Sequence, residues 1–247
     1  MAEQESPAAR AARLPDQASV LEEAEFTSPS GKTYRVLKTR EADPYEKPLA
    51  AEELAMAGAA RLPPGDNFTG TDRRDAKLEI VNAHRENFAD LKALVGSLAP
   101  DANMTNHHPP LTRDSHFQRV QEEKRNVHVK AFLYAASREA DNDFHFIVGT
   151  EPGSPPTFMN MELSGLPPAG SASFAHIQAT RNAYKTFVKG HLPGVGYHHY
   201  DPPIPIEVEG SLFFDITHAH GEHPGPAKIR PKTIWEVHPI SKITFEP

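Results

Sequence analysis

The second half of the chain alternates apolar and polar residues, and this pattern most limits what the chain can fold into. From position 127 to 134, the odd-numbered residues Val127, Val129, Ala131 and Leu133 alternate with bulkier or polar neighbours. A period of two is typical of a half-buried β-strand. Further strands are predicted, in chain order, at 144–148, 157–163, 204–216, 233–238 and 240–245, and an amphipathic helix is predicted at 173–188. Loops rich in Gly and Pro separate these segments.

This order is three strands, one helix, and then two strands or a strand pair. It is the order of the OB-fold, a five-stranded Greek-key barrel whose helix lies between strands three and four. We therefore expect an α+β protein with a C-terminal five-stranded OB-like β-barrel and a mainly helical and irregular N-terminal region. The expected units are residues 1–125 and residues 126–247. Another small barrel or a half-open sheet would produce the same order of elements.

The N-terminal region gives weaker patterns. Residues 1–25 lack a consistent apolar stripe and predict a frayed arm. A turn at 29–31 followed by alternating residues predicts a short hairpin over 26–37. A short helix is predicted at 50–60. The clearest helix is predicted at 72–98, where apolar residues recur at helical spacing and Pro100 follows the end.

Composition excludes several classes of protein. The chain of 247 residues has no cysteine, 14 histidines and a net charge of -7. The absence of cysteine excludes disulfides, thiolate metal sites and cysteine nucleophiles. No secretory signal and no bilayer-length apolar run is present, so we expect a cytoplasmic protein with no membrane association. The acidic balance does not favour binding to nucleic acid, although local basic patches leave that partner open.

Three segments each hold an acidic residue and a histidine two or three positions apart: Asp143 with His145, Asp215 with His218, and Glu236 with His238. In an OB-like barrel the loops at 139–143 and 217–231 flank one binding face, so we expect these groups to converge at one end. Carboxylates and imidazoles can bind Zn²⁺ or Mn²⁺ and activate water, and an acid-oriented histidine can serve as a general base. The same groups could equally form hydrogen bonds at strand ends.

A second candidate metal site lies in the loop that follows the strand at 204–216. It consists of His218, His220 and His223, because a His-x-His pair on an extended segment can chelate one ion. A solvated polar loop is the alternative explanation. The sequence therefore suggests a divalent metal ion as the cofactor. It does not identify which ion that is.

A candidate ligand-binding face lies on the strand at 127–134. Lys130, Phe132 and Tyr134 occupy its less regular face. Aromatic side chains beside a cation can stack the bases of single-stranded nucleic acid. The same aromatic residues could instead pack beneath the helix or the N-terminal region.

Three segments of the C-terminal half resemble an uncharacterised bacterial family. They are D-x-D-F-H at Asp141–His145, G-x-L-F-F-D-x-x-H at Gly210–His218 and W-E-V-H-P-I at Trp235–Ile240. The resemblance covers about half of the chain and implies a small OB-like β-barrel domain. It draws attention to the acids and histidines inside the matching segments, and it implies no activity.

The sequence leaves three classes of function open. The leading hypothesis is a binding module whose ligand lies across the barrel face between the loops at 139–143 and 217–231. That ligand could be single-stranded nucleic acid, a small molecule or a protein. The second hypothesis is a metal-dependent or acid/histidine hydrolase with its site at the strand ends. The third is a structural or interaction protein of a larger assembly. Neither the ligand nor the oligomeric state follows from the sequence.

Overall fold

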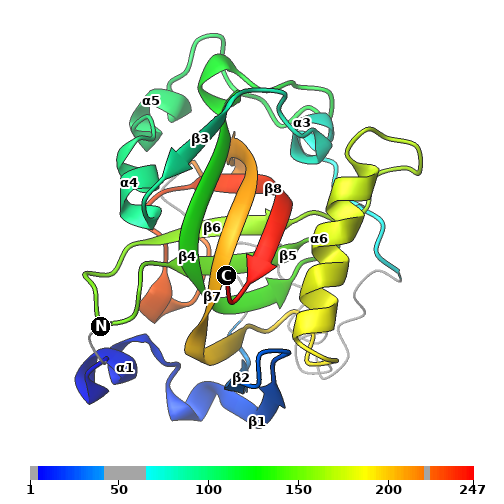
Figure 1. The fold of residues 1–247 in the computed structure, drawn as a ribbon. Helices are drawn as coiled ribbons and strands as arrows, with labels where there is room; N and C mark the ends of the chain where they lie inside the picture. The colour runs from blue at the N-terminus through cyan, green and yellow to red at the C-terminus, as the bar shows by residue number, and fades with distance from the viewer. Residues whose placement is uncertain (1–4, 42–64, 220–222) are drawn as a thin grey trace.

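The computed structural model describes residues 5–41, 65–219 and 223–247. Their fold is α+β, with one eight-stranded sheet and a few mostly short helices (Figure 1). The strands are β1 Val20–Thr27, β2 Thr33–Thr39, β3 Arg85–Phe88, β4 Asn126–Arg138, β5 Phe144–Gly149, β6 Phe158–Leu163, β7 His198–Phe214 and β8 Trp235–Phe245. The α-helices are α1 Pro7–Arg13, α3 Arg74–Leu78, α4 Leu91–Gly96, α5 Asp101–Thr105 and α6 Phe174–Phe187.

The five C-terminal strands are paired continuously. β4 runs antiparallel to both β5 and β7, and β5 runs antiparallel to β6. β6 is parallel to β8, which in turn is antiparallel to β7. The strands predicted at 127–134, 144–148 and 157–163 are thus confirmed. The strand predicted at 204–216 is β7, which begins earlier, at His198, and ends at Phe214. The two segments predicted at 233–238 and 240–245 form the single strand β8. The register of β7 and β8 shifts around Gly210, and the two strands stay paired on both sides of this shift.

Helix α6 lies between β6 and β7 in the chain and packs beside β8 (Figure 1). The predicted helix at 173–188 is confirmed. Tyr184 explains its placement, because the ring is buried against Phe144 and Phe146 and its hydroxyl lies 2.6 Å from that of Tyr200. A buried tyrosine needs such a partner for its hydroxyl.

The N-terminal region adds strands to the same sheet. β1 and β2 form the predicted hairpin, and β2 pairs with β7. β3 lies parallel to the start of β4. In Figure 1, α1, β1 and β2 lie at the lower end of the long strands, and α3, α4 and α5 lie at the upper end. The boundary between residues 125 and 126 stays a prediction.

The predicted frayed arm at 1–25 is wrong for the part that the structure describes. α1 is anchored because Arg10 and Arg13 both form ion pairs with Asp201 of β7, to which Arg35 of β2 also donates. Asp201 is 3% exposed. Long-range ion pairs of this kind are invisible to a search for apolar stripes, and β1 then continues the ordered chain from Val20.

Acid should weaken the contacts that hold α1. Burial disfavours the charged form of Asp201, but hydrogen bonds from the three arginines outweigh it and lower the pKa to about 2. This contribution is complete above the ordinary pKa of 3.8 and is lost as the pH falls toward 2. We expect Asp201→Asn to cost about 1–3 kcal/mol at pH 7, with the difference from the wild type shrinking below pH 4. Urea unfolding of the two proteins from pH 7 to pH 2.5 measures this difference in stability. A difference that does not change with pH would contradict the expected role of Asp201.

The predicted helix at 72–98 is also wrong. The segment forms α3, then β3, then α4. Asp90 has an extended backbone and its carboxylate accepts the Ala93 N–H, so a new helix begins there. The pairing of β3 with β4 supplies backbone hydrogen bonds that outweigh the helical propensity of the segment. The short helix predicted at 50–60 lies outside the described residues.

Gly210 permits the close approach of β7 and β8. A Cβ atom there would lie 2.5 Å from Val237 Cγ1 and 2.6 Å from the Pro239 carbonyl oxygen. We expect Gly210→Ala to lower the free energy of unfolding by about 1–3 kcal/mol, measured by urea denaturation. Gly194→Ala is the matched control, because no atom lies within 4 Å of its added Cβ. Equal stability of the two variants would show that β8 is not held against Gly210.

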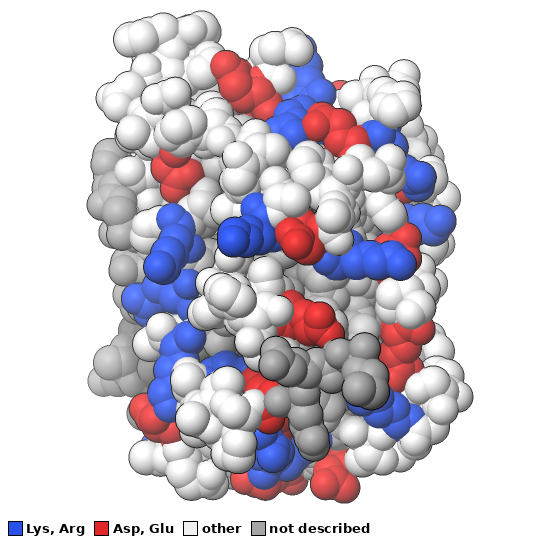
Figure 2. All heavy atoms as spheres, turned by 60° about the vertical axis from the view of Figure 1, so that its left-hand side comes forward, with Lys and Arg blue, Asp and Glu red and all other residues white. Residues whose placement is uncertain are grey.

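Figure 2 shows a face on which Lys and Arg side chains are interspersed with Asp and Glu side chains. This face lacks the continuous positive surface that tracks a phosphate backbone. Among the described residues, no helix combines the length and the apolar character needed to cross a membrane.

Candidate functional site

A cluster of acidic and histidine side chains is buried where the ends of several strands meet. We call it the acid–histidine cluster, and it consists of Lys77, Glu139, Asp141, Asp143, His145, Glu162, Asp215, Glu236 and His238. Five of its members are at most 2% exposed, namely Asp143, His145, Glu162, Glu236 and His238. Burial of so many ionisable groups is costly and is rare outside functional or metal-binding sites.

The strand registers bring these residues together. His145 of β5 is paired directly with Glu162 of β6. Glu236 of β8 is paired with Asn160 on one side and Phe213 on the other. The turn between β4 and β5 adds Asp141 and Asp143. It requires a left-handed residue, Asn142 at φ 76°, a conformation that asparagine tolerates well.

Asp143, Glu162 and His238 form the first set of metal-ligating groups. One potential ligand atom from each lies within 4.8 Å of the others. His238 Nε2 is 3.3 Å from Asp143 Oδ2, and His238 Nδ1 is 2.9 Å from Glu162 Oε2. None of these four buried atoms is aligned for a hydrogen bond. Three fully buried groups thus face one another at short range without well-aligned hydrogen bonds.

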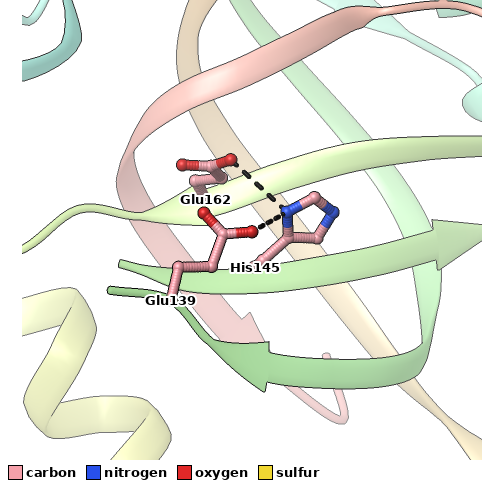
Figure 3. Close-up of side chains that lie close together, drawn as sticks. All are labelled: Glu139, His145 and Glu162. Atoms are coloured by element: carbon pink, nitrogen blue, oxygen red, sulfur yellow. Dashed lines mark hydrogen bonds and ion pairs between the residues drawn. The ribbon is translucent and has the colours of Figure 1, made fainter. Parts of the chain in front are cut away.

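Glu139, His145 and Glu162 form the second set (Figure 3). The carboxylates of Glu139 and Glu162 both point toward Nδ1 of His145. The distances are 2.6 Å from Nδ1 to Glu139 Oε1 and 3.6 Å to Glu162 Oε1. Glu162 therefore belongs to both sets.

Negative charge dominates the cluster. Burial, reinforced by the charges of Asp141 and Glu162, raises the pKa of Asp143 well above its ordinary value. Burial and the charge of Glu162 do the same to the pKa of Glu236. Burial also opposes ionisation of Glu162, yet His238 and Lys77 together hold its pKa well below the ordinary value. Without a further cation, some of these carboxyl groups must keep a proton.

Lys77 of α3 brings a positive charge to the acid–histidine cluster. Its side chain is buried, and its Nζ lies 3.9 Å from Asp215 Oδ2. Burial alone would lower its pKa, but the charges of Glu162 and Asp215 raise the pKa well above 10.5. The ammonium group therefore stays charged and offsets one carboxylate.

Of the six candidate residues from the sequence, Asp143, His145, Glu236 and His238 lie within the core of the cluster. Asp215 reaches it through Lys77, and its carboxylate also accepts the N–H and the hydroxyl of Thr217. His218 lies farther out, with its Nε2 3.9 Å from Asp215 Oδ2.

The second candidate metal site is described only in part, because His220 lies outside the described residues. His218 and His223 line one pocket of about 290 Å³, together with Asp101 and Ile234. Within the described part of the chain, neither histidine belongs to a set of three converging metal ligands.

The candidate ligand-binding residues of β4 differ in exposure. Lys130 is exposed and Phe132 is half-buried, whereas Tyr134 is 6% exposed. The Tyr134 hydroxyl donates to the Thr150 carbonyl at 2.7 Å, and its ring packs edge-on against Phe158. Tyr134 therefore offers no open ring face for stacking a base.

Sequence reasoning missed four members of the cluster, Lys77, Glu139, Asp141 and Glu162, and two arginines that support it. Arg119 is 3% exposed and donates to the carbonyls of His238, Leu212, Ala76 and Glu79. Burial lowers its pKa to about 10. Arg181 is 1% exposed and donates to the carbonyls of Asn142, Leu163 and Ser164. The two guanidinium groups fix the backbone on either side of the ligating residues.

Comparison with known proteins gives no match to any protein-family model, curated protein or solved structure.

Proposed function

We propose that this protein is a metal-dependent hydrolase whose divalent cation is bound by Asp143, Glu162 and His238. One observation carries the proposal: these fully buried groups converge within 4.8 Å, and their facing atoms make no well-aligned hydrogen bond. A buried network that existed only to join strand ends would satisfy its polar atoms. A cation bound among them would take one ligand atom from each residue, with a single ring nitrogen from His238.

Charge balance supports the same proposal. The cluster has six carboxyl groups, and Lys77 offsets one of them. Unpaired buried carboxylates are strongly destabilising. A divalent cation would take the place of the protons that Asp143 and Glu236 otherwise keep, because metal ligands bind in their deprotonated form.

The donor atoms indicate which cation fits. Carboxylates and imidazoles without thiolates suit Zn²⁺ or Mn²⁺. Such an ion, when bound, supplies an activated water and polarises a carbonyl or phosphoryl oxygen. Glu236 would be the residue to exchange a proton with such a water, since its Oε2 lies 3.7 Å from His238 Nδ1 and makes no aligned hydrogen bond. Lys77 would stabilise anionic groups beside it.

The pocket lined by His218 and His223 is the proposed entrance for a small polar substrate. His218 contacts Asp215, and Asp215 contacts Lys77 at the border of the cluster. The volume of about 290 Å³ is at the lower end for small-molecule sites.

The test uses tag-free protein that is stripped of metal and then loaded with Zn²⁺ or Mn²⁺. Hydrolysis of p-nitrophenyl phosphate, bis(p-nitrophenyl) phosphate and p-nitrophenyl acetate is followed by absorbance. We expect metal-dependent turnover of at least one ester, reduced about 10²-fold or more by Asp143→Asn. His128→Gln is the control, because His128 pairs with Glu207 at 2.6 Å outside the cluster. Loaded protein no faster than Asp143→Asn on every ester would overturn the hydrolase proposal.

A binding module built on an OB-like barrel is the second candidate. The observation in its favour is that pairing runs from β4 through β5, β6, β8 and β7 and returns to β4. Helix α6 lies between β6 and β7 in the chain, which are the third and fourth of these five strands in sequence order. Fluorescence anisotropy with a labelled single-stranded oligonucleotide tests its nucleic-acid form. Binding that weakens as salt rises would support it, and flat traces at low salt would exclude it.

A further inference from the structure

We infer that the acid–histidine cluster binds two divalent cations and that Glu162 bridges them. This inference rests on the proposed metal-dependent function. Its basis is the orientation of one carboxylate. Glu162 Oε1 lies 3.6 Å from His145 Nδ1, whereas Glu162 Oε2 lies 2.9 Å from His238 Nδ1. The two oxygens thus face two different imidazoles.

Each imidazole belongs to its own ligand set. Asp143 and His238 complete one set with Glu162, and Glu139 and His145 complete the other. In both sets the ligand atoms lie within 4.8 Å of one another. A carboxylate that offers one oxygen to each of two sets has the arrangement of a bridging ligand, and paired ions in hydrolases lie close enough to share such a ligand.

The number of carboxyl groups in the cluster leaves enough negative charge for two ions. The six carboxylates of the cluster are Glu139, Asp141, Asp143, Glu162, Asp215 and Glu236. When all six are ionised, one divalent cation and Lys77 offset three of the negative charges, and two cations and Lys77 offset five. Two cations would therefore let all the ligating carboxyl groups ionise with a residual charge near zero, whereas one cation leaves several of them to keep a proton.

The alternative explanation is that Glu139 only orients His145. The contact of 2.6 Å between Glu139 Oε1 and His145 Nδ1 is a hydrogen bond, and carboxylates commonly orient metal-binding histidines in this way. That role needs Glu139 alone. It gives no role to Glu162 Oε1, which faces the same nitrogen at 3.6 Å, beyond hydrogen-bond distance.

The experiment is a calorimetric titration of metal-stripped, tag-free protein with Mn²⁺. We expect about two equivalents for the wild type and for the control His128→Gln, and about one equivalent for Glu139→Gln or Asp143→Asn, since each variant damages one set. The second readout is electron paramagnetic resonance of the loaded protein. The wild type should give the exchange-coupled spectrum of a bridged Mn²⁺ pair, and Glu139→Gln should give that of isolated Mn²⁺.

The outcomes separate this inference from the proposal beneath it. One equivalent in both the wild type and Glu139→Gln, with none in Asp143→Asn, would overturn the second ion and leave the first. No binding by folded wild-type protein would overturn both. Circular dichroism checks the fold of each variant, and His145→Gln replaces Glu139→Gln if the latter does not fold.

Discussion

Glu162→Gln is expected to weaken the binding of divalent metal by about 10²–10³-fold. Glu162 is common to both ligand sets, and its carboxylate is 2% exposed at the centre of the cluster. Glutamine keeps the shape but removes the charge. Loss of one buried charged partner costs about 3–5 kcal/mol, and the lower part of that range, about 3–4 kcal/mol, corresponds to this change in affinity. Calorimetric titration of the stripped proteins with Zn²⁺ and Mn²⁺ measures the change.

Thermal or urea unfolding gives an independent check on Glu162→Gln. A ligand that binds only the folded state at a hundredfold excess over its Kd stabilises it by about 2.7 kcal/mol. The wild type should gain this amount when metal is added, and the variant should gain little. If both proteins were stabilised equally, the ion would lie elsewhere, and the pocket of His218 and His223 would be the next place to examine.

Arg73→Met is expected to destabilise the protein by about 3–5 kcal/mol, the largest loss of stability that the structure indicates. Arg73 and Glu123 are 1% and 0% exposed and form a bidentate ion pair, with both N–O distances at 2.7 Å. Glu123 also accepts the N–H groups of Val120 and Phe214. The variant leaves this carboxylate buried without its cation.

The double variant Arg73→Met, Glu123→Gln is the matched control. Its glutamine carries no charge and still accepts backbone N–H groups, so we expect it to recover part of the lost stability. Chemical denaturation of the wild type and the variants measures the coupling. A single variant within 1 kcal/mol of the wild type would show that this pair does not hold the end of β7.

The strands and α6 could be predicted because each satisfies its own pattern locally. Val127, Val129, Ala131 and Leu133 alternate and are all buried. The segment from 72 to 98 could not be predicted in this way. Its apolar residues have helical spacing, but β3 forms from the middle of the segment because β4 offers it hydrogen bonds. The contacts of α1 with Asp201 are equally non-local.

The residues of the candidate site divide in the same way, into those with a local sequence signal and those that join the cluster only through distant contacts. Asp143, His145, Glu236 and His238 attract notice because each acid lies close to a histidine in the sequence. Glu162 stands among apolar neighbours with no histidine near it, and it meets His145 only through the register of β5 and β6. Lys77 joins the cluster only because α3 docks there. Tyr134 shows the converse, since its position in the sequence suggested a stacking surface and its ring is buried.

The most direct test of the metal centre is X-ray diffraction at the zinc or manganese absorption edge, from crystals of tag-free protein grown with that metal. We expect an anomalous peak about 2.0–2.2 Å from oxygens of Asp143 and Glu162 and from a ring nitrogen of His238. A cluster without such a peak at saturating metal, with these side chains joined by direct hydrogen bonds instead, would contradict it and leave the cluster a structural network.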